Sequence, residues 1–215
     1  MKVEKISDAV VRRMPIYLRY LNDLQRRDVT TVSSQELGHN LDLNPAQIRK
    51  DLAYFGDFGR KGIGYDVTYL IEKIRQILNL DQQINVALIG AGNLGHALSN
   101  YNMYLKDTMK IVAVFDASPI RIGEKINNLF VQPVTELSET VKALNIRIGI
   151  ITVPDHEAQR VADQLIGAGI EAILNFAPII LKVPPEVRIH AADFTTDLLS
   201  LAYYLNDRKE TSNES

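Results

Sequence analysis

The spacing of hydrophobic residues changes near Asp81 and divides the 215-residue chain into two regions. Before Asp81, apolar residues recur every three or four positions, as on one face of a helix, for example at Met14 and Leu18. After Asp81, continuous Val/Ile/Leu runs alternate with helical segments, a pattern typical of parallel strands that are buried on both faces. We therefore predict an α/β chain with a helical domain over residues 1–80 and a parallel-sheet domain over residues 81–192.

Capping residues mark the expected helix starts in the first region. Pro15 suits a first helical position, so we expect a helix to begin there after a short helical turn over residues 7–13. Ser33 with Glu36 has the spacing of a capping box and predicts a helix over about 34–40. The other expected starts are Asn44 before Pro45, with Gln47 at the capping-box position and Gly56 ending the helix, and Asp66.

A short helix, a four-residue turn and a second helix over residues 45–55 form a helix-turn-helix pattern. The polar face of the second helix carries Gln47, Lys50, Asp51 and Tyr54, with Arg49 beside them. Lys50 suits a guanine edge, Gln47 an adenine edge and Arg49 a phosphate group. Asp51 is discordant because a carboxylate repels phosphates, and we expect it to orient Arg49 or Lys50. The pattern predicts a DNA-reading helix.

Two cations follow this helix in a glycine-flanked turn. Arg60 and Lys61, with Gly62 after them, are expected at the tip of a hairpin wing, where cations can enter a minor groove narrowed by A·T pairs. Arg12 and Arg13 are expected to add contacts to the DNA backbone. A solvated helix and an ordinary surface loop are the alternative interpretation. The capped helix pair together with the basic wing favours a winged-helix DNA-binding domain.

The second region opens with a glycine-rich loop, GAGNLG, between an expected strand over residues 84–90 and an expected helix over 93–105. In this dinucleotide fingerprint Gly90 permits the tight turn, Gly92 lets the backbone approach a pyrophosphate, and Gly95 lets the helix pack closely on the strand. The intervening Asn93 and Leu94 complete the loop. The sequence therefore predicts a Rossmann-like domain.

Further cofactor-binding residues are expected at the carboxyl ends of the strands. Asp116 ends the second strand, 21 residues after Gly95, and an acidic residue there accepts hydrogen bonds from a ribose, which favours NAD(H). Arg121 lies close enough to complicate that reading. Two later strand ends are expected to face the nicotinamide, and they carry Thr152, Val153, Pro154, Asn175, Phe176 and Ala177. Another adenine ligand such as coenzyme A, or no ligand, stays open as an alternative.

Catalytic chemistry finds little support in the sequence. His156 is the only histidine expected near the pocket, and it is also an ordinary residue for a helix start. The second region leaves no room for a separate substrate domain, so we expect a cofactor-sensing protein without catalytic residues. A small NAD-dependent oxidoreductase is the rival interpretation. The absence of cysteine removes thiolate metal sites and thiol nucleophiles, and we expect no metal.

The net charge of −2 conceals two opposite balances. Residues 1–80 contain 13 Lys and Arg against 10 Asp and Glu, a charge of +3, whereas residues 81–215 contain 11 against 16, a charge of −5. The mildly basic region suits a polyanionic partner such as double-stranded DNA. No signal peptide or membrane-spanning run is recognised, so we expect a cytoplasmic protein. The polar residues 208–215 are expected to be disordered.

The segment QIRKDLAYFGDFGRKGIGYDV, followed by GAGNLG, closely resembles the Rex family of bacterial redox-sensing transcriptional repressors, over about residues 5–207. The resemblance implies a homodimer with an N-terminal winged helix and a C-terminal Rossmann domain. It also implies that a last helix, residues 193–207 here, is swapped onto the partner subunit. The family's NAD⁺-bound or unliganded dimer binds a palindromic, A·T-rich operator, and NADH releases it.

The same resemblance assigns residues to the dimer and its switch. Phe194 would approach the partner's nicotinamide pocket. The polar residues described for the family fall on Asp193, Tyr101 and Arg19. A helix that packs on its own subunit is the alternative for residues 193–207.

Overall fold

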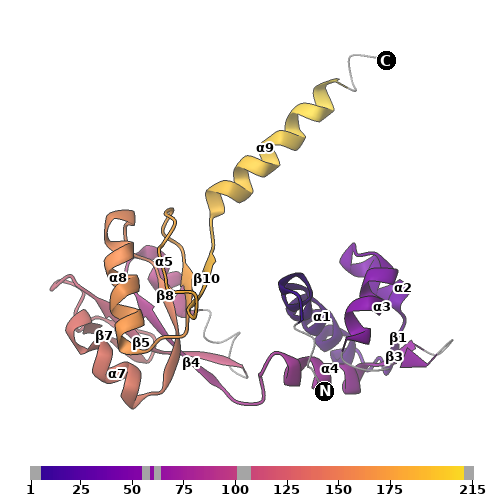
Figure 1. Cartoon of the computed structure of the whole chain (residues 1–215), viewed down its shortest axis with the longest axis horizontal. Coiled ribbons are helices and arrows are strands. Elements are labelled where there is room, and N and C mark those ends of the chain that lie inside the picture. Colours follow the sequence, from indigo (N-terminus) through magenta and orange to yellow (C-terminus); the bar gives the residue numbers. More distant parts are fainter. Residues whose placement is uncertain (1–5, 55–58, 61–63, 101–107, 211–215) are drawn as a thin grey trace. The chain divides into compact units, whose positions relative to one another are not determined.

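The computed structural model describes residues 6–54, 59–60, 64–100 and 108–210. The chain divides into two compact units, Met1–Gln82 and Gln83–Ser215, with a boundary two residues beyond the expected one. Figure 1 shows the elements of both units.

The N-terminal unit alternates helices with very short strands. Its elements are α1 (Asp8–Arg26), β1 (Thr31–Val32), α2 (Ser34–Leu41), α3 (Pro45–Ala53), β2 (Gly59–Arg60), β3 (Gly64–Asp66) and α4 (Val67–Ile77). The strands form a small antiparallel sheet in the order β1-β3-β2. This order of helices and hairpin is that of the winged helix-turn-helix expected from the sequence.

Helix α1 is longer than the sequence pattern indicated. It begins after Ser7, whose hydroxyl accepts a hydrogen bond from the Val10 amide, and runs through Pro15 without ending. The expectation of a helix start at Pro15 is therefore wrong. A proline inside a helix removes one hydrogen bond. Here buried residues on both sides of Pro15, such as Met14 and Tyr17, hold the two halves on one core and offset that loss.

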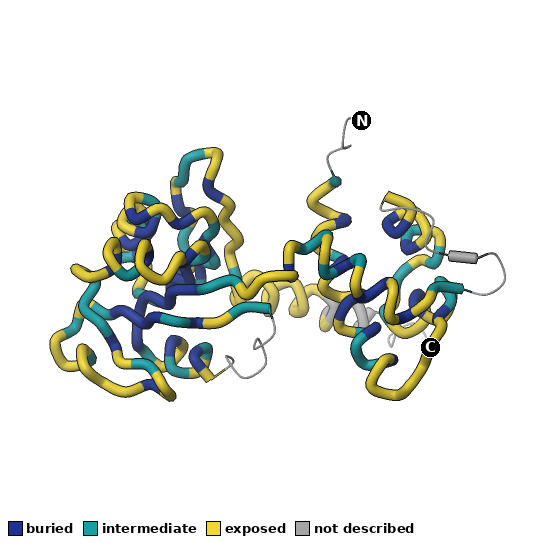
Figure 2. The backbone as a smooth tube through the Cα atoms, turned by 90° about the horizontal axis from the view of Figure 1, so that it is seen from below, coloured by how far each residue is buried: buried dark blue, intermediate teal, exposed yellow. Residues whose placement is uncertain are grey.

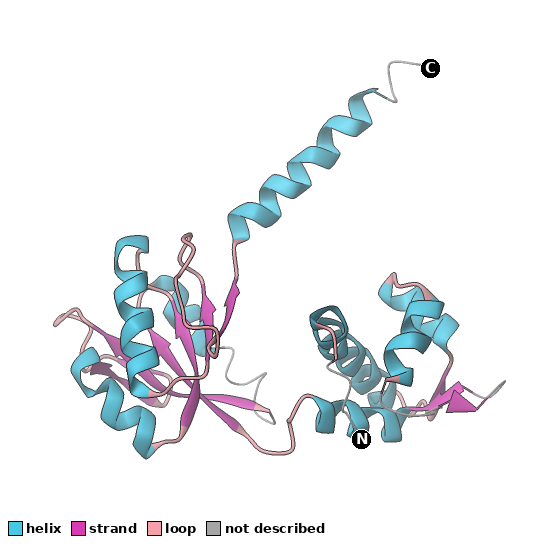
Figure 3. Cartoon of the chain, in the orientation of Figure 1, coloured by secondary structure: helices cyan, strands magenta, loops and turns pink. Residues whose placement is uncertain are grey.

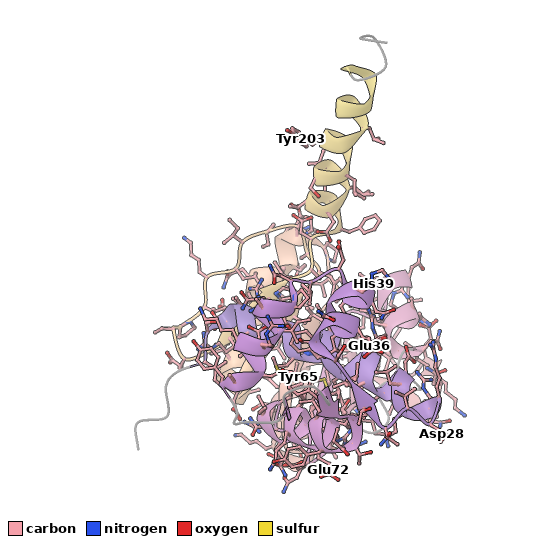
Figure 4. The ribbon with its side chains drawn as sticks, turned by 90° about the vertical axis from the view of Figure 1, so that its right-hand side faces the viewer. Asp28, Glu36, His39, Tyr65, Glu72 and Tyr203 are labelled. Atoms are coloured by element: carbon pink, nitrogen blue, oxygen red, sulfur yellow. The ribbon has the colours of Figure 1, made fainter. Side chains whose placement is uncertain are left out.

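The caps of α2 and α4 agree with the sequence. Ser33 Oγ accepts a hydrogen bond from the Glu36 amide (3.1 Å), and the Glu36 carboxylate accepts one from the Ser33 amide (2.8 Å), which completes the capping box. Glu36 is labelled on α2 in Figure 4. Asp66 caps α4 through the Tyr69 amide. Helix α3 begins after Asn44 as expected and ends at Ala53, and Gly56 lies outside the described residues.

The C-terminal unit is built on one seven-stranded sheet. Its elements are β4 (Ile84–Ile89), α5 (Asn93–Asn100), β5 (Met109–Asp116), β6 (Lys125–Ile126), β7 (Leu129–Pro133), η1 (Val134–Glu136), α7 (Leu137–Ala143), β8 (Ile146–Ile151), α8 (Asp155–Ala168), β9 (Ala172–Asn175), β10 (Arg188–Ala191) and α9 (Phe194–Glu210). The strand order is β10-β9-β8-β4-β5-β7-β6. Apart from the edge strand β6, which is antiparallel, this is the Rossmann order, and the topological switch lies between β4 and β8.

Helices cover both faces of this sheet, as Figure 3 shows. One face packs Ile89 and Phe115 against buried residues of α7 and α8. The opposite face packs Val86 and Leu88 against Leu98 of α5. Burial of both faces explains why the strands read as continuous apolar runs, and Figure 2 shows the buried stretches along the central strands. The hairpin β6–β7 was missed because β6 has only two residues and β7, LFVQP, is a short run that ends in proline.

Helix α9 differs in its exposure from the other helices described in this unit. Its described apolar side chains are half or more exposed, namely Phe194, Leu198, Leu199, Leu201, Tyr203 and Leu205. All four residues of the preceding strand β10 are also exposed. Figure 4 labels Tyr203 on this helix. The helix therefore presents a large apolar surface that its own unit leaves uncovered.

Candidate functional site

The three glycines of the loop after β4 do what the fingerprint requires. Gly90 has φ +107°, and a Cβ on it would lie 2.6 Å from the Thr152 carbonyl oxygen. A Cβ on Gly95 would lie 2.0 Å from the Gly90 carbonyl oxygen, so only glycine allows α5 to approach the loop this closely. A Cβ on Gly92 would meet nothing within 4 Å. The surface over Gly92 is therefore open to a ligand.

Asp116 holds this loop in place. Its Oδ2 accepts a hydrogen bond from the Ala91 amide (2.7 Å), and its Oδ1 accepts one from the Ser118 amide (2.8 Å). Arg121 donates from Nη1 to the Ala91 carbonyl oxygen (2.6 Å). Both Asp116 oxygens thus already bind backbone amides, and each keeps a further lone pair that could accept from a ribose hydroxyl.

The end of β8 closes the other side of the loop. The Thr152 hydroxyl donates to the carbonyl oxygens of Ile89 (3.0 Å) and Gly90 (2.8 Å), alternative acceptors for its one proton. A cavity of about 370 Å³ lies between these strand ends. Its lining residues are Ile89, Gly90, Gly92, Asp116, Ala117, Arg121, Val134, Thr152, Val153, Pro154, Glu157, Arg160 and Val161. Six of the expected cofactor-binding residues are therefore brought together around one cavity at the topological switch.

The polar face of α3 is only partly exposed. Arg49, Lys50 and Tyr54 are exposed, and Arg49 donates to the hydroxyl of Ser34 on α2 (2.9 Å). Gln47 is half-buried. Asp51, predicted on the same face, has no exposed side-chain surface.

Asp51 lies instead between α3 and α1, where four donors surround its carboxylate. Arg13 donates from Nε to Oδ2 (2.5 Å) and from Nη2 to Oδ1 (2.8 Å). The Tyr17 hydroxyl donates to Oδ2 (2.7 Å), and Gln47 Nε2 donates to Oδ1 (2.7 Å). The expectation that Asp51 orients Arg49 or Lys50 is wrong. Arg13, assigned from the sequence to the DNA backbone, uses Nε and Nη2 for this carboxylate, and its contact with DNA stays a prediction.

Burial and hydrogen bonding set the charges in this cluster. Burial works against ionisation of Asp51, but the hydrogen bonds from Arg13, Tyr17 and Gln47 together outweigh it and lower the pKa of its carboxyl. Burial, with the hydrogen bond to Asp51, raises the pKa of the Tyr17 hydroxyl. Asp51 is therefore a carboxylate and Tyr17 a neutral donor at neutral pH. Gln47 does not complete the capping box of α3, because its side-chain NH₂ group donates to Asp51. Asn44 caps the helix by accepting from the Ala46 amide.

Two family models match the chain, one on each unit. The model described as putative DNA-binding protein N-terminus matches residues 5–53, and the model described as CoA binding domain matches residues 81–179. The redox-sensing transcriptional repressor Rex of Brevibacillus brevis is 63% identical over 204 residues, which cover 95% of this chain and 99% of that protein. The chain belongs to the Rex family of redox-sensing transcriptional repressors. The Rex protein of Desulfitobacterium hafniense is 44% identical and covers 97% of this chain.

Solved Rex-family structures share the fold over nearly the whole chain. The crystal structure of RSP in complex with β-NAD⁺ and operator DNA has a TM-score of 0.89 and 40% identity, and covers 97% of this chain and 96% of that one. The structure of RSP in complex with β-NADH has a TM-score of 0.87 and 38% identity. RSP is described as a Rex-family repressor. The resemblance and the fold class expected from the sequence are thereby confirmed.

Within this Rex-family fold, the loop after β9 departs from expectation. Asn175 is 1% exposed, and its amide donates to the carbonyl oxygens of Ala177 (3.0 Å) and Ile179 (3.1 Å) while its Oδ1 accepts from the Ala177 amide (2.9 Å). Ala177 is part of the core, and Phe176 packs against the opposite face of the sheet. These three residues do not line the described cavity. Asn175 shapes its own turn, and contact of these three residues with a cofactor stays a prediction.

Two charged residues of the cavity wall were not expected. Glu157 and Arg160 lie one helical turn apart on α8, form an ion pair with each other, and line the cavity beside Pro154. The sequence signal was available, because both follow directly on the strand end that was predicted to face the ligand. Helical spacing alone did not show which side of α8 turns toward the cavity.

The residues that the Rex resemblance assigned to a switch lie in different parts of the chain. Arg19 is exposed on α1. Asp193 accepts hydrogen bonds from the Thr195 amide (2.9 Å) and the Thr196 hydroxyl (2.6 Å), and the hydrogen bonding to Thr196 lowers the pKa of its carboxyl. Phe194 is 73% exposed. Tyr101 lies outside the described residues, so no contact among these groups is assigned.

The remaining candidate residues belong to the wing, to α1 and to the start of α8. Arg60 pairs with Gly64 in the antiparallel hairpin β2–β3, whereas Lys61 and Gly62 lie outside the described residues. Arg12 is exposed on α1. His156 is exposed at the start of α8, beside Asp155, and is not among the residues that line the cavity.

The described residues contain neither a metal site nor a membrane-spanning helix. No group of three or more His, Asp or Glu among them is arranged to hold a metal ion. None of the helices within those ranges combines the length and the apolar character that crossing a bilayer requires.

Proposed function

We propose that this protein is a transcriptional repressor that binds a palindromic, A·T-rich operator as a homodimer and is released from it by NADH. The observation that carries the proposal is the likeness, over 97% of the chain, to a Rex-family repressor crystallised with β-NAD⁺ and operator DNA. The open surface over Gly92 supports a dinucleotide beside the glycine loop, and the exposed Arg49 and Lys50 support contact with DNA.

The exposed apolar face of α9 supports the homodimer. Side chains such as Leu198 and Leu201 gain about 1.5–3 kcal/mol each when they are removed from water, so a helix with six exposed apolar side chains needs a covering surface. A second copy of the chain supplies one by exchange of the helix. Phe194, at the start of α9, would then be placed near the nicotinamide pocket of the other subunit.

NADH can act on DNA binding only through a difference in its affinity for two states of the dimer. The neutral dihydronicotinamide tolerates an apolar pocket beside Phe194, whereas the cationic ring of NAD⁺ loses hydration there. The reduced cofactor therefore favours the state that buries its ring, and that state is the one released from DNA.

The deciding experiment is an electrophoretic shift with a palindromic operator, titrated with NADH and, in parallel, with NAD⁺. We expect NADH to weaken the complex several-fold more than NAD⁺ does. Equal effects of the two cofactors would end the redox-sensing proposal, and no shift at all would end the DNA-binding one.

Two substitutions separate the two activities. Lys50→Ala should weaken operator binding and leave NADH affinity unchanged, because Lys50 lies in the other unit. Asp116→Ala should weaken NADH binding, since it removes both a ribose acceptor and the brace on Ala91. Loss of both activities in Lys50→Ala would indicate misfolding instead.

Coenzyme A is a second candidate ligand, because a CoA-binding family model matches residues 81–179. The phosphorylated ribose of coenzyme A would place a phosphate near Asp116, where like charges repel, so we favour NAD(H). An equilibrium comparison of NADH with coenzyme A tests this preference, and tighter binding of coenzyme A would reverse it.

We also propose that the protein is not an enzyme. His156, the one histidine that the sequence offered as a general acid, is exposed beside Asp155 and is not among the residues that line the described cavity. Steady consumption of NADH with a metabolite would overturn this view. A bacterial repressor meets DNA in the cytoplasm, and that is where we propose that the protein acts.

A further inference from the structure

The buried carboxylate of Asp51 fixes the direction of the one polar side chain of α3 that touches it. A carboxylate accepts hydrogen bonds but cannot donate them. Gln47 must therefore turn its NH₂ group, not its oxygen, toward Asp51, and the Nε2–Oδ1 distance of 2.7 Å shows a full hydrogen bond. The carbonyl oxygen Oε1 of Gln47 consequently lies on the side of the amide away from Asp51.

Asp51 itself has no freedom to turn. Its two oxygens receive four hydrogen bonds, two from Arg13 and one each from Tyr17 and Gln47, which is the full accepting capacity of a carboxylate. Arg13 and Tyr17 belong to α1, so the carboxylate is anchored on a different helix from the one that carries it. An unsupported Gln amide turns over freely and offers a donor or an acceptor, whereas this one is held in one orientation.

We propose that Asp51 is a positioning residue for DNA readout, which turns the Gln47 amide so that its Oε1 is presented to a base edge as a hydrogen-bond acceptor. The inference rests on the proposed DNA-binding function and deepens it. The chemical partner is an exocyclic amine in the major groove, which means N6 of adenine or N4 of cytosine. Guanine and thymine present acceptors at the corresponding edge, and an acceptor facing an acceptor disfavours them.

The surroundings of Gln47 suit this role. Gln47 is half-buried, while Lys50, one turn further along α3, is exposed. Among the hydrogen bonds of the described residues, none uses Gln47 Oε1. The atom is therefore held by its amide on one side and available on the other, next to a cation that suits the DNA surface.

The test combines a modified operator with variants of the chain. In the operator, each adenine in turn is replaced by purine, which lacks the N6 amine, and each cytosine by 2-pyrimidinone, which lacks the N4 amine. Binding is measured by fluorescence anisotropy. We expect wild-type affinity to fall about fivefold when one base in each half-site loses its amine.

Gln47→Ala is the central variant, because it removes the amide and leaves the Arg13–Asp51 pair in place. It should bind the intact operator about fivefold more weakly and show no further loss at the base that wild type discriminates. Lys50→Ala is the matched control on the same helix. It should weaken binding but keep the discrimination at that base.

Asp51→Asn tests the positioning itself. The Asn side chain offers a donor and an acceptor, so the Gln47 amide loses its single orientation, and discrimination at the same base should fall while NADH affinity in the other unit is retained. Tyr17→Phe is the control for this variant: it removes one hydrogen bond to Asp51 but leaves a carboxylate that can only accept, so the Gln47 amide should keep its orientation and the discrimination should be retained.

Three outcomes overturn the inference. The first is a Gln47→Ala protein that loses affinity but still discriminates at every base as wild type does. The second is a folded Asp51→Asn protein with unchanged discrimination, or a folded Tyr17→Phe protein that has lost it. The third is a wild-type protein that discriminates at no amine-bearing base although it binds the operator. A wild-type protein that does not bind the operator at all would instead contradict the proposed function, so the two failures are distinguishable.

Discussion

The glycine loop of the C-terminal unit and helix α3 of the N-terminal unit present chemistry in opposite ways. The loop offers backbone atoms, and its glycines are needed because a side chain on Gly90 or Gly95 would collide with neighbouring backbone. Helix α3 offers side chains, and the direction of Gln47 depends on Asp51, which is held by Arg13, 38 residues away in the chain. A site made of backbone atoms is disrupted when a substitution adds atoms to it. A site made of side chains is disrupted when a substitution removes a distant hydrogen-bond partner.

We expect the largest loss of stability from a substitution in the N-terminal unit. Asp51→Ala leaves Arg13 facing a buried space without its carboxylate, and we expect a loss of about 3 kcal/mol in the free energy of unfolding of that unit. Hydrogen exchange of the α1 and α3 amides measures this unit separately from the other.

Asp23→Ala is the matched control, because Asp23 also pairs with an arginine of α1 but both side chains are well exposed. Its effect should stay below about 0.5 kcal/mol. Similar losses in the two variants would show that burial of Asp51 is not the source of the effect.

We expect the next largest loss of stability when a side chain is added to the glycine loop. Gly95→Ala places a Cβ 2.0 Å from the Gly90 oxygen, and the required shift of α5 should cost about 2 kcal/mol of stability in the C-terminal unit. Gly92→Ala adds the same atom in open space, so its thermal unfolding should match wild type while NADH affinity falls about tenfold. Equal destabilisation by both substitutions would contradict the distinct roles of these glycines.

A smaller effect is expected at the start of α2. Ser33→Ala removes one half of the capping box and should lower stability by about 1 kcal/mol in chemical denaturation. The neighbouring Ser34→Ala loses only an exposed contact with Arg49 and should change stability far less. A larger effect of Ser34→Ala would assign the stabilisation to the Arg49 contact instead of the cap.

We expect the smallest change in stability when the pH is lowered. The folded pKa of Asp51 is lowered, so its ionisation stabilises the fold fully above the unfolded aspartate pKa of about 3.9, and this contribution is lost as pH falls below that value. The stability difference between wild type and Asp51→Asn should therefore be constant from neutral pH to about 5 and should narrow only below about 4. Narrowing near neutral pH would mean that Asp51 is not held as an anion.

Local signals in the sequence were sufficient for part of this structure. Ser33 with Glu36, and Asp66 before α4, predicted helix starts that the structure confirms, because a cap involves residues within one turn of each other. The glycine spacing and Asp116 likewise placed the cavity, since parallel strands end at the same edge of the sheet.

The features that the sequence did not predict depend on residues that are distant in the chain or on the detailed packing around them. A helical wheel places Asp51 beside Gln47 and Lys50 but does not show that Arg13 and Tyr17 of α1 contact Asp51. Pro15 is tolerated inside α1 because of the core that its neighbours pack against. Asn175 ends a strand at the edge where a ligand is expected, and the sequence did not show that its side chain also hydrogen-bonds within its own loop.

The peptide group of Ala91 is held at both ends, by Asp116 at its N–H and by Arg121 at its carbonyl oxygen. Much of the conformational entropy that an unbraced loop would lose when it closes on a dinucleotide has therefore already been given up in folding. The affinity lost on removing Asp116 would then contain an entropic part that belongs to the loop and not to any contact with the ligand. Calorimetry can separate it, because that part appears as a more unfavourable entropy of binding with little change in enthalpy.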